Sequence, residues 1–588
     1  MSDPWISGGG LATPPWSEGE QVDGIPGVRL GPGVQARVLT NERASLALVG
    51  DVSLAGEEEP KLLDAVAGGR WAELTYLPGS YWVLAQNGTH RFVCGDLSGL
   101  RSVFYTMHGP HTLWSTSARR LATHCAAPPD LAMLAARLTA GAEHWPKRTA
   151  YEGVYAVPGG FGLLLGGPQP ELVDVSGIEP LATLAEGAPV FGAALKRAVH
   201  WRMQEASGRA GADVSGGLDS SSVAILAARV GEVRAVTYAD AFTSAEDLTF
   251  ARRVAQHMDA PLHVGTGGRA HLPFAWQPNQ PVTDQPAAMS LTTAQQQLYL
   301  RPAAGLPLHF TGNGGDVVLD SCSAAWIGMV QCGDRRAARR QVTGWARARN
   351  RSPRELWQAV TRAAEIGHAG ALQDAAGRMA RGDFEARRPG VWSWCHLGQS
   401  ATWLTPFGRE RVAALLRGAA DSADKAARAD LAEQHLSLRL VGADARDTAP
   451  LAAAWGVRQV HPFIDNQVVR AAFAISPIER HGVTTFKPLL AAALPSLPTW
   501  LTSRRSKGSF SRQLTAGMLH NQAALAHLIR TSPLVTSGLL DPEPALAALA
   551  GIGGAHAGAL YDLQRLTMTS QWLATSSHST KLELEEAC

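Results

Sequence analysis

The residues best suited to chemistry form one continuous segment, Asp213-Val-Ser-Gly-Gly-Leu-Asp-Ser-Ser-Ser222. Gly216 and Gly217 allow the backbone to fold into a concavity lined by N–H groups, and the helix expected next adds about half a positive charge at its N-terminus. With serine hydroxyls around it, this concavity suits an anion with several oxygens, such as pyrophosphate. The sequence contains no G-x-x-x-x-G-K-[ST] motif, so the expected site differs from a Walker-type loop.

An acidic residue, Asp219, lies inside this expected anion site. A Mg²⁺ ion that bridges the carboxylate and the phosphates would resolve the conflict of charge, because Mg²⁺ prefers oxygen ligands. The alternative is a glycine turn that only caps a helix. The position of residues 215–221 between an expected strand and an expected helix favours the phosphate site.

Strands and helices alternate around this segment from about residue 190 onward. The alternation predicts parallel strands joined by right-handed helical crossovers. Ser244-Ala-Glu-Asp247 has the pattern of a capping box at the start of one helix. We expect strands at 212–214, 233–238, 261–264 and 307–310, and helices at 220–230 and 244–258.

Short apolar runs with turn residues between them come earlier and predict a β-rich N-terminal part. Asn87-Gly88 suits a tight hairpin turn, because both residues tolerate positive φ. From about residue 331 the chain is expected to be helical, and the block 331–390 holds 13 arginines against 6 acidic residues. This block could be a surface for a peptide or only a solvated helical face. The expected N-terminal strands are 46–50, 80–85, 89–94, 102–105 and 112–115.

The composition limits the classes of protein that remain. A chain of 588 residues is expected to hold roughly two to four domains, and its net charge of +2 gives no strong field toward nucleic acid. No apolar stretch is long enough for a membrane span, and the start lacks the basic and apolar regions of a secretion signal. Six scattered cysteines without a C-x-x-C pair predict neither disulfides nor a zinc site. We therefore expect a soluble, cytoplasmic protein.

Residues 215–221 resemble the PP-loop of ATP pyrophosphatases, which cleave ATP between its α- and β-phosphates and adenylate a substrate. Within this group the chain resembles the asparagine synthetase B family, because two further segments match that family in the same order. They are Leu306-Pro-Leu-His-Phe-Thr-Gly-Asn-Gly-Gly-Asp316 and Trp455-Gly-Val-Arg-Gln-Val-His-Pro-Phe-Ile-Asp465. The segments that resemble the family's glutaminase domain are 77–82 and 95–105.

The resemblance implies a fold class and two domains. The class is α/β (α+β overall), with a β-rich Ntn-glutaminase-like domain over 1–185 and a PP-loop parallel-sheet synthetase domain with a helical C-terminal part over 186–588. An active glutaminase of this family carries a cysteine at position 2, but this chain has Ser2, and its nearest cysteine, Cys94, lies in an expected strand. Because a serine hydroxyl is a weaker nucleophile than a thiol, we expect a degenerate domain without amide hydrolysis.

The resemblance also assigns roles in a site for ATP and Mg²⁺. Asp219 and Asp316 are the expected Mg²⁺ ligands, and Lys487 and Lys507 are the expected catalytic contacts of the leaving pyrophosphate. Asp316 could instead be a turn residue, and either lysine could be an exposed surface cation. The residues expected around ATP are Val214, Ser215, Gly216, Gly217, Asp219, Ser220, Ser221, Tyr238 and Gly312.

If no glutamine is hydrolysed, the attacking amine must come from a substrate. Two branches of the family have this property, the β-lactam synthetases and the lasso peptide cyclases. Asp447-Thr-Ala-Pro450 resembles the E-x-x-P motif of β-lactam synthetases, whose Glu belongs to a Tyr–Glu dyad, but the position of that Tyr is Asn313 here. Since an amide does not titrate near neutral pH, the lasso peptide cyclase is the leading hypothesis.

A lasso peptide cyclase would adenylate an Asp or Glu side chain of a precursor peptide and close a macrolactam with the peptide's N-terminal amine. Asp447 is then the candidate that accepts the ammonium proton or orients the amine, unless it only pairs with neighbouring Arg446. His461 is interpreted as a packing residue. The expected partners are the precursor peptide, a leader-binding protein and a leader peptidase. The alternatives are a β-lactam synthetase-like cyclase, an ammonia-dependent asparagine synthetase, a tRNA-modifying PP-loop enzyme and an inactive ATP-binding scaffold.

Overall fold

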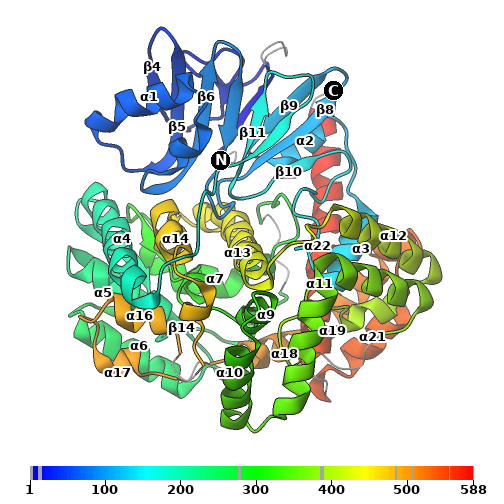
Figure 1. Cartoon of the computed structure of the whole chain (residues 1–588). Helices are drawn as coiled ribbons and strands as arrows, with labels where there is room; N and C mark the ends of the chain where they lie inside the picture. The colour runs from blue at the N-terminus through cyan, green and yellow to red at the C-terminus, as the bar shows by residue number, and fades with distance from the viewer. Residues whose placement is uncertain are drawn as a thin grey trace.

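The computed structural model describes residues 4–10, 16–275, 280–384, 390–483, 486–505, 508–554 and 557–586 (Figure 1). Antiparallel sheets form the N-terminal part, a parallel sheet flanked by helices follows, and the C-terminal part is helical. This mixed architecture confirms the fold class that the sequence predicts.

Two six-stranded antiparallel sheets make up the N-terminal part. In strand β5 (Ala44–Val52), alternate side chains point to opposite faces of the sheet. Leu46 and Leu48 pack with helix α1 (Glu59–Ala67), whereas Ala47 and Val49 pack with the other sheet. One sheet contains, in order, β10 (Tyr155–Val157), β8 (Val103–His108), β9 (His111–Ser115), β1 (Ile6–Gly9), β3 (Arg29–Leu30) and β2 (Glu20–Gln21). The other contains β12 (Glu171–Asp174), β11 (Phe161–Leu165), β7 (Arg91–Cys94), β6 (Gly79–Asn87), β5 and β4 (Ala36–Thr40).

The five expected N-terminal strands are all present. The turn at Asn87-Gly88 joins β6 and β7 as predicted, but for a different reason. Neither residue has positive φ, so that part of the prediction is wrong. Instead the Asn87 side-chain oxygen accepts hydrogen bonds from the N–H groups of Thr89 (3.1 Å) and His90 (2.9 Å). The turn is therefore stabilised by an asparagine side chain and not by left-handed backbone.

The parallel sheet has five strands in the order β15-β14-β13-β16-β17. After β13 the chain forms β14 and β15 on one side of that strand, and then returns to form β16 and β17 on its other side. The strand order therefore reverses between β13 and β16, and open α/β sheets bind their ligands at such a point, outside the carboxyl ends of the strands. The strands are β13 (Arg209–Asp213), β14 (Glu232–Ala239), β15 (Leu262–Thr266), β16 (His309–Phe310) and β17 (Gln459–Val460).

Both predicted crossover helices are present, but the predicted capping box is wrong. The Ser244 side chain makes no capping hydrogen bond at the start of α6. Asp247, which follows it, pairs instead with Arg504 and accepts a hydrogen bond from the Gly508 N–H group at 3.4 Å. A long-range ion pair thus replaces the local cap. The helices that pack on the parallel sheet are α4 (Leu184–Glu205), α5 (Leu218–Ala228), α6 (Ala245–His257) and α7 (Thr293–Leu300).

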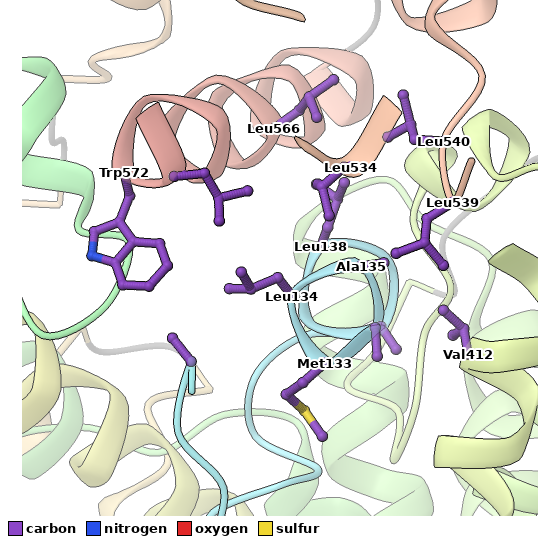
Figure 2. Packing of buried hydrophobic residues seen from close by; sticks show 14 of the residues in the cluster. Met133, Leu134, Ala135, Leu138, Val412, Leu534, Leu539, Leu540, Leu566 and Trp572 are labelled. Carbon is purple, nitrogen blue, oxygen red and sulfur yellow. The ribbon is translucent and has the colours of Figure 1, made fainter. Parts of the chain in front are cut away.

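Helices make up most of the remaining chain, as expected (Figure 1). Helix α3 (Leu131–Ala140) precedes them in the chain but packs in their midst, and Figure 2 shows its Leu134 and Leu138 among Leu534, Leu566 and Trp572. Within the described ranges, no helix combines the length and the apolar character that a membrane span requires. The helices used below are α8 (Gly315–Val318), α9 (Ala324–Gln331), α10 (Arg335–Ala348), α11 (Pro353–Arg381), α12 (Pro406–Ser422), α13 (Ala429–Ala454), α14 (Asn466–Phe473), α21 (Pro542–Ala550) and α22 (Ala557–Glu586).

A loop of the N-terminal part, residues 95–101, lies against α13 and α14. The Leu97 N–H group donates to Asn466 Oδ1 at 3.0 Å. A Cβ atom on Gly442 of α13 would come within 2.0 Å of the Ser98 carbonyl oxygen, so the two backbones are in close contact. Because such buried contacts join the two parts, their division into two domains at residue 185 stays a prediction.

A buried ion pair in the parallel-sheet part provides a test of this packing. Arg202 and Asp465 lie 2.9 Å apart with 2% and 0% of their side chains exposed. The substitution Arg202→Ala would leave a buried carboxylate without its partner, at a cost of about 3–5 kcal/mol. We expect the midpoint of urea unfolding, measured by circular dichroism, to fall markedly. Arg209→Ala is the control, because its 3.9 Å pair with Glu232 is exposed and is worth at most about 1 kcal/mol. Equal midpoints for the two variants would contradict this packing.

Candidate functional site

The glycine loop follows β13 and leads into α5, at the point where the strand order reverses. Gly216 has a φ of +78°, and a Cβ atom there would lie 2.3 Å from the Asp247 carbonyl oxygen, so the position requires glycine. Gly217 is the N-cap of α5. The first N–H groups of α5 therefore open into the loop, which is the arrangement that binds phosphate oxygens.

The serines of the loop are linked to one another. The Ser215 N–H group donates to Ser220 Oγ at 3.2 Å, and the two hydroxyl oxygens are 2.9 Å apart. Ser221 Oγ is buried and has no hydrogen-bond partner among the described residues. The Val214 side chain is buried in the core, so only its backbone can face a ligand. The loop thus presents hydroxyl and backbone groups, as the sequence predicts for a phosphate site.

The loop after β16 approaches the first loop so closely that it requires glycines. A Cβ atom on Gly312 would lie 2.5 Å from the backbone nitrogen of Ser220. A Cβ atom on Gly315 would lie 2.4 Å from Cγ of Asp219. The glycines therefore allow Asp316, which follows directly in α8, to lie next to Asp219.

Lys487 lies between these two carboxylates. Its Nζ is 2.5 Å from both carboxylate oxygens of Asp219 and 2.7 Å from Oδ1 of Asp316, and its side chain is only 2% exposed. The Lys487 backbone is left-handed, with a φ of +50°, and its N–H group donates to Asp320 Oδ2 at 3.1 Å. Such a backbone persists only where its surroundings hold it. The structure thus brings together three residues that the sequence predicts for one site.

The charge of this cluster fits a divalent cation. Two carboxylates meet at one ammonium group here, and carboxylate oxygens are ligands that Mg²⁺ prefers. In the part of the chain that the structure describes, no group of three or more His, Cys, Asp or Glu side chains is arranged to hold a metal. A Mg²⁺ ion at Asp219 and Asp316 would therefore complete its coordination with phosphate and water oxygens, as Mg²⁺ does in nucleotide sites.

Arg504 contacts the glycine loop, although the sequence alone does not single it out. Its guanidinium group donates to the Gly216 carbonyl oxygen and to the Asp247 carboxylate, and it lies 4.3 Å from the ring centre of Phe250. This contact fixes the glycine loop against α6. The only signal in the sequence is the basic run that ends at Lys507. Lys507 itself lies outside the described residues, so its role stays a prediction.

Tyr238 stands near the carboxyl end of β14, next to the strand that carries the glycine loop. A Cβ atom on Gly267 would lie 1.9 Å from the Tyr238 hydroxyl oxygen, so the ring lies directly against this glycine. Burial raises the pKa of Tyr238, which keeps the phenol neutral. Its role as a wall for adenosine stays a prediction.

The carboxylate of Asp447 in α13 forms hydrogen bonds with Arg446 and Gln285. Its carboxylate accepts hydrogen bonds from Arg446 Nε at 3.0 Å, from Arg446 Nη2 at 3.1 Å and from Gln285 Nε2 at 2.9 Å. Burial raises the pKa of Asp447, and the Arg446 guanidinium acts in the opposite direction. None of these partners belongs to the loops around Lys487. The pairing with Arg446, one of the two interpretations from the sequence, is present.

His461 supports the glycine loop that follows β16 through its contact with Thr311. Its Nδ1 lies 2.6 Å from Thr311 Oγ1, and the same Thr311 oxygen accepts a hydrogen bond from the Asn313 N–H group at 3.3 Å. Burial lowers the pKa of His461 to about 3, so the ring is neutral near neutral pH. A neutral, buried ring that holds a loop agrees with the interpretation of His461 as a packing residue.

A sequence profile described as asparagine synthase matches residues 191–574, which is more than half of the chain. The chain therefore belongs to the asparagine synthase family, whose members are ATP-dependent, amide-forming ligases that typically use Mg²⁺. The glycine loop, Asp219, Asp316 and Lys487 all lie within the matched residues.

Comparison with solved structures adds little to this assignment. One match is a structure of the allosteric regulatory enzyme of purine biosynthesis, with 14% identity over 47% of this chain and 56% of the other. Another is a glutamine phosphoribosylpyrophosphate amidotransferase from B. subtilis in complex with ADP and GMP, with 13% identity over 47% of this chain and 64% of the other. The TM-score is 0.17 in both cases, and this chain spans less than two thirds of either protein. No curated protein sequence matches.

The contact between the two glycine loops predicts the effect of one added methyl group. Gly312→Ala would force the loops apart, because its Cβ atom would lie 2.5 Å from the Ser220 nitrogen. Overpacking of this kind costs about 1–3 kcal/mol, so we expect affinity for ATP with Mg²⁺, measured by calorimetry, to fall about tenfold or more. Gly344→Ala in α10 is the control, since no atom lies within 4 Å of its Cβ position. Unchanged affinity for Gly312→Ala would contradict the placement of the site.

His461 predicts a pH dependence of stability. Its pKa is about 3 in the folded protein and about 6.5 when unfolded, so below pH 6.5 the unfolded chain binds a proton that the folded protein does not. Stability is therefore lost as the pH falls from about 6.5 toward 3, by about 1.4 kcal/mol per pH unit from this residue. We expect His461→Gln to show a smaller fall of the urea midpoint over this range, and exposed His527→Gln to follow the wild type. Parallel curves for wild type and His461→Gln would contradict the neutral ring.

Proposed function

We propose that this protein is a lasso peptide cyclase, an AMP-forming ligase that closes a macrolactam on a precursor peptide. The observation that supports the proposal most is the contact of Asp219 and Asp316 with Lys487 beside the glycine loop. This cluster provides charge both for a divalent cation and for a leaving pyrophosphate, and adenylation of a carboxylate requires both.

The first proposed step is adenylation. An Asp or Glu side-chain carboxylate of the peptide attacks the α-phosphorus of ATP, a carboxyl O–P bond forms, and the bond to the β-phosphate oxygen breaks to release pyrophosphate. The first turn of α5 and the hydroxyls of Ser215 and Ser220 hold the departing oxygens, and Lys487 donates to them. A Mg²⁺ ion on Asp219 and Asp316 would supply neutralisation of the charge on pyrophosphate.

The second proposed step is ring closure. The N-terminal amine of the peptide attacks the acyl carbon, the amide C–N bond forms, the C–O bond to AMP breaks, and the amine loses a proton. The enzyme contributes mainly by holding the amine and the acyl carbon about 3–3.5 Å apart. We assign Asp447 to orient this amine or to take its proton, which requires that one of its hydrogen bonds to Arg446 or Gln285 opens.

Three residues bear on whether the attacking amine comes from glutamine or from the substrate. Cys94 is fully buried in β7, and burial raises the pKa of its thiol, so it is not available as a nucleophile. Ser2 lies outside the described residues. Asn313, which stands where a β-lactam synthetase has its Tyr, is exposed beside Asp316 and does not titrate. These features favour an amine from the substrate and disfavour a β-lactam product.

The proposed peptide substrate implies further partner proteins. A precursor peptide with a leader requires a leader-binding protein and a leader peptidase, and we propose both as partners. Helix α10 offers one docking surface, because it buries Ala338, Val342 and Ala346 and turns its arginines to solvent. The exposed arginines are Arg335, Arg336, Arg339, Arg340 and Arg347.

The proposal is tested by incubation with ATP, Mg²⁺ and the precursor peptide encoded beside the gene for this chain. We expect AMP, pyrophosphate and a peptide that has lost one water, as measured by mass spectrometry. Asp219→Asn should lower ATP–pyrophosphate exchange about 100-fold or more, because it removes a charge that the leaving group requires. Glu232→Gln, at an exposed position of β14, should leave exchange unchanged.

Three outcomes would contradict the proposal. Absence of AMP and pyrophosphate would indicate an ATP-binding scaffold. Loss of water from a small β-amino acid instead of the peptide would indicate a β-lactam product. Formation of asparagine from aspartate and ammonia would indicate an asparagine synthetase.

A further inference from the structure

A small hollow that is not part of the nucleotide site lies beside the first turns of α13. Its volume is about 70 Å³. This exceeds the ~10–15 Å³ that a cavity needs in order to hold one water molecule. Three separate segments of the chain build it, and its walls include Glu143, Trp392, Trp394, Glu433 and Ser437.

Two of these walls are the carboxylates of Glu143 and Glu433. Glu433 Oε1 accepts a hydrogen bond from Ser437 Oγ at 2.6 Å. In the described part of the chain, neither Glu433 nor Glu143 forms a salt bridge within 4.0 Å. Burial raises the pKa of Glu433, and the Ser437 hydroxyl and the positive charge of Arg480 act in the opposite direction. A cation in the hollow would add to these groups and favour the ionised carboxylate.

Two other walls are indole rings held in fixed orientations. The rings of Trp392 and Trp394 are 5.0 Å apart between centres and meet edge to face, at 67°. Trp394 Nε1 donates to the Ala363 carbonyl oxygen at 2.9 Å, and His368 stacks on the same ring at 5.1 Å. The faces of indole rings attract cations more strongly than those of other aromatic side chains. Rigid indoles beside two carboxylates therefore form a pocket for a positive charge.

The hollow is connected to the nucleotide site through one short segment. The Trp392 N–H group donates to Ser323 Oγ at 2.7 Å, and Ser323 is only seven residues beyond Asp316. Between them, Asp320 accepts the hydrogen bond from the Lys487 backbone. Residues 316–323 thus contact both Lys487, through Asp320, and the backbone of Trp392, through Ser323.

The same side of α13 continues as an acidic surface. Glu433, Leu440 and Asp444 are spaced by seven and four residues, which places them on one side of the helix. Leu440 is 45% exposed and Asp444 is also exposed, yet the surrounding protein raises the pKa of Asp444 to about 6. From Glu433 to Asp447 the helix rises about 21 Å, at 1.5 Å per residue. A cation in the hollow would therefore lie on α13 about four turns before Asp447, which is buried.

We propose that this hollow binds a primary ammonium group at the end of an alkyl or peptide chain. The group enters between Glu143 and Glu433 and lies beside the rings of Trp392 and Trp394. The volume has room for an ammonium group with its adjoining methylene. The inference rests on the proposed function only in making this group part of the peptide, where it is a lysine side chain, because the N-terminal amine is assigned to Asp447.

The test uses the full-length protein without ATP. Ligand-observed saturation-transfer NMR would compare n-butylammonium, which resembles a lysine side chain, with glycine methylamide, which resembles an N-terminal amine. The neutral analogue n-butanol is the control for apolar binding. We expect saturable binding of n-butylammonium, weaker binding of glycine methylamide and none of n-butanol. Tighter binding of glycine methylamide would place the N-terminal amine in the hollow and contradict its assignment to Asp447.

Substitutions connect this binding to the hollow. Glu433→Gln should weaken binding of the ammonium probe about tenfold or more, and Glu143→Gln should act in the same direction. Glu543→Gln, at an exposed position of α21, should have no effect. Melting curves show whether each variant is folded, and Glu143→Gln keeps the test valid if Glu433→Gln is not. Equal binding of n-butanol, or unchanged binding by the folded variants, would overturn the inference.

The outcome is separable from that of the proposed function. If the probe binds through Glu433 but the precursor peptide yields no AMP, the hollow is confirmed and the cyclase proposal fails. If the peptide is cyclised but no ammonium probe binds, the cyclase proposal stands and the hollow is only a gap in the packing.

Discussion

The contact of buried Lys487 with Asp219 and Asp316 is the interaction on which the site depends. Two carboxylates that share one partner repel each other, and a cation between them offsets this repulsion. Lys487 supplies that cation from a left-handed backbone. Glycines at 312 and 315 are equally necessary, because any side chain there would separate the two loops. The charge of Lys487 and the close approach of the two loops thus determine together where Asp219 and Asp316 lie.

The rest of the molecule holds this geometry in place. Arg504 fixes the first loop to α6, and neutral His461 supports the second through Thr311. The N-terminal part contributes as well, because its loop 95–101 lies against α13 and its helix α3 is buried among the C-terminal helices. Loss of amide hydrolysis would therefore not remove the need for this part, since the core is incomplete without it.

Local patterns in the sequence were sufficient for the elements and for the first loop, because strand–glycine–helix order and hydrophobic periodicity act over a few residues. Long-range contacts were not accessible in this way. Lys487 meets Asp219 across 268 residues, and Arg504 meets Gly216 across 288. The same limit explains why the prediction of a capping box at Ser244 was wrong, because Asp247 has the distant Arg504 as its partner. Asp447 remained ambiguous for this reason, since its neighbour Arg446 was visible in the sequence and Gln285 was not.

The most direct test of the account is a crystal structure with a non-hydrolysable ATP analogue and Mn²⁺ in place of Mg²⁺. We expect an anomalous peak bonded to carboxylate oxygens of both Asp219 and Asp316, with the phosphate chain in the glycine loop and Lys487 turned toward it. A metal ion bound elsewhere, or a nucleotide that contacts neither aspartate, would contradict it.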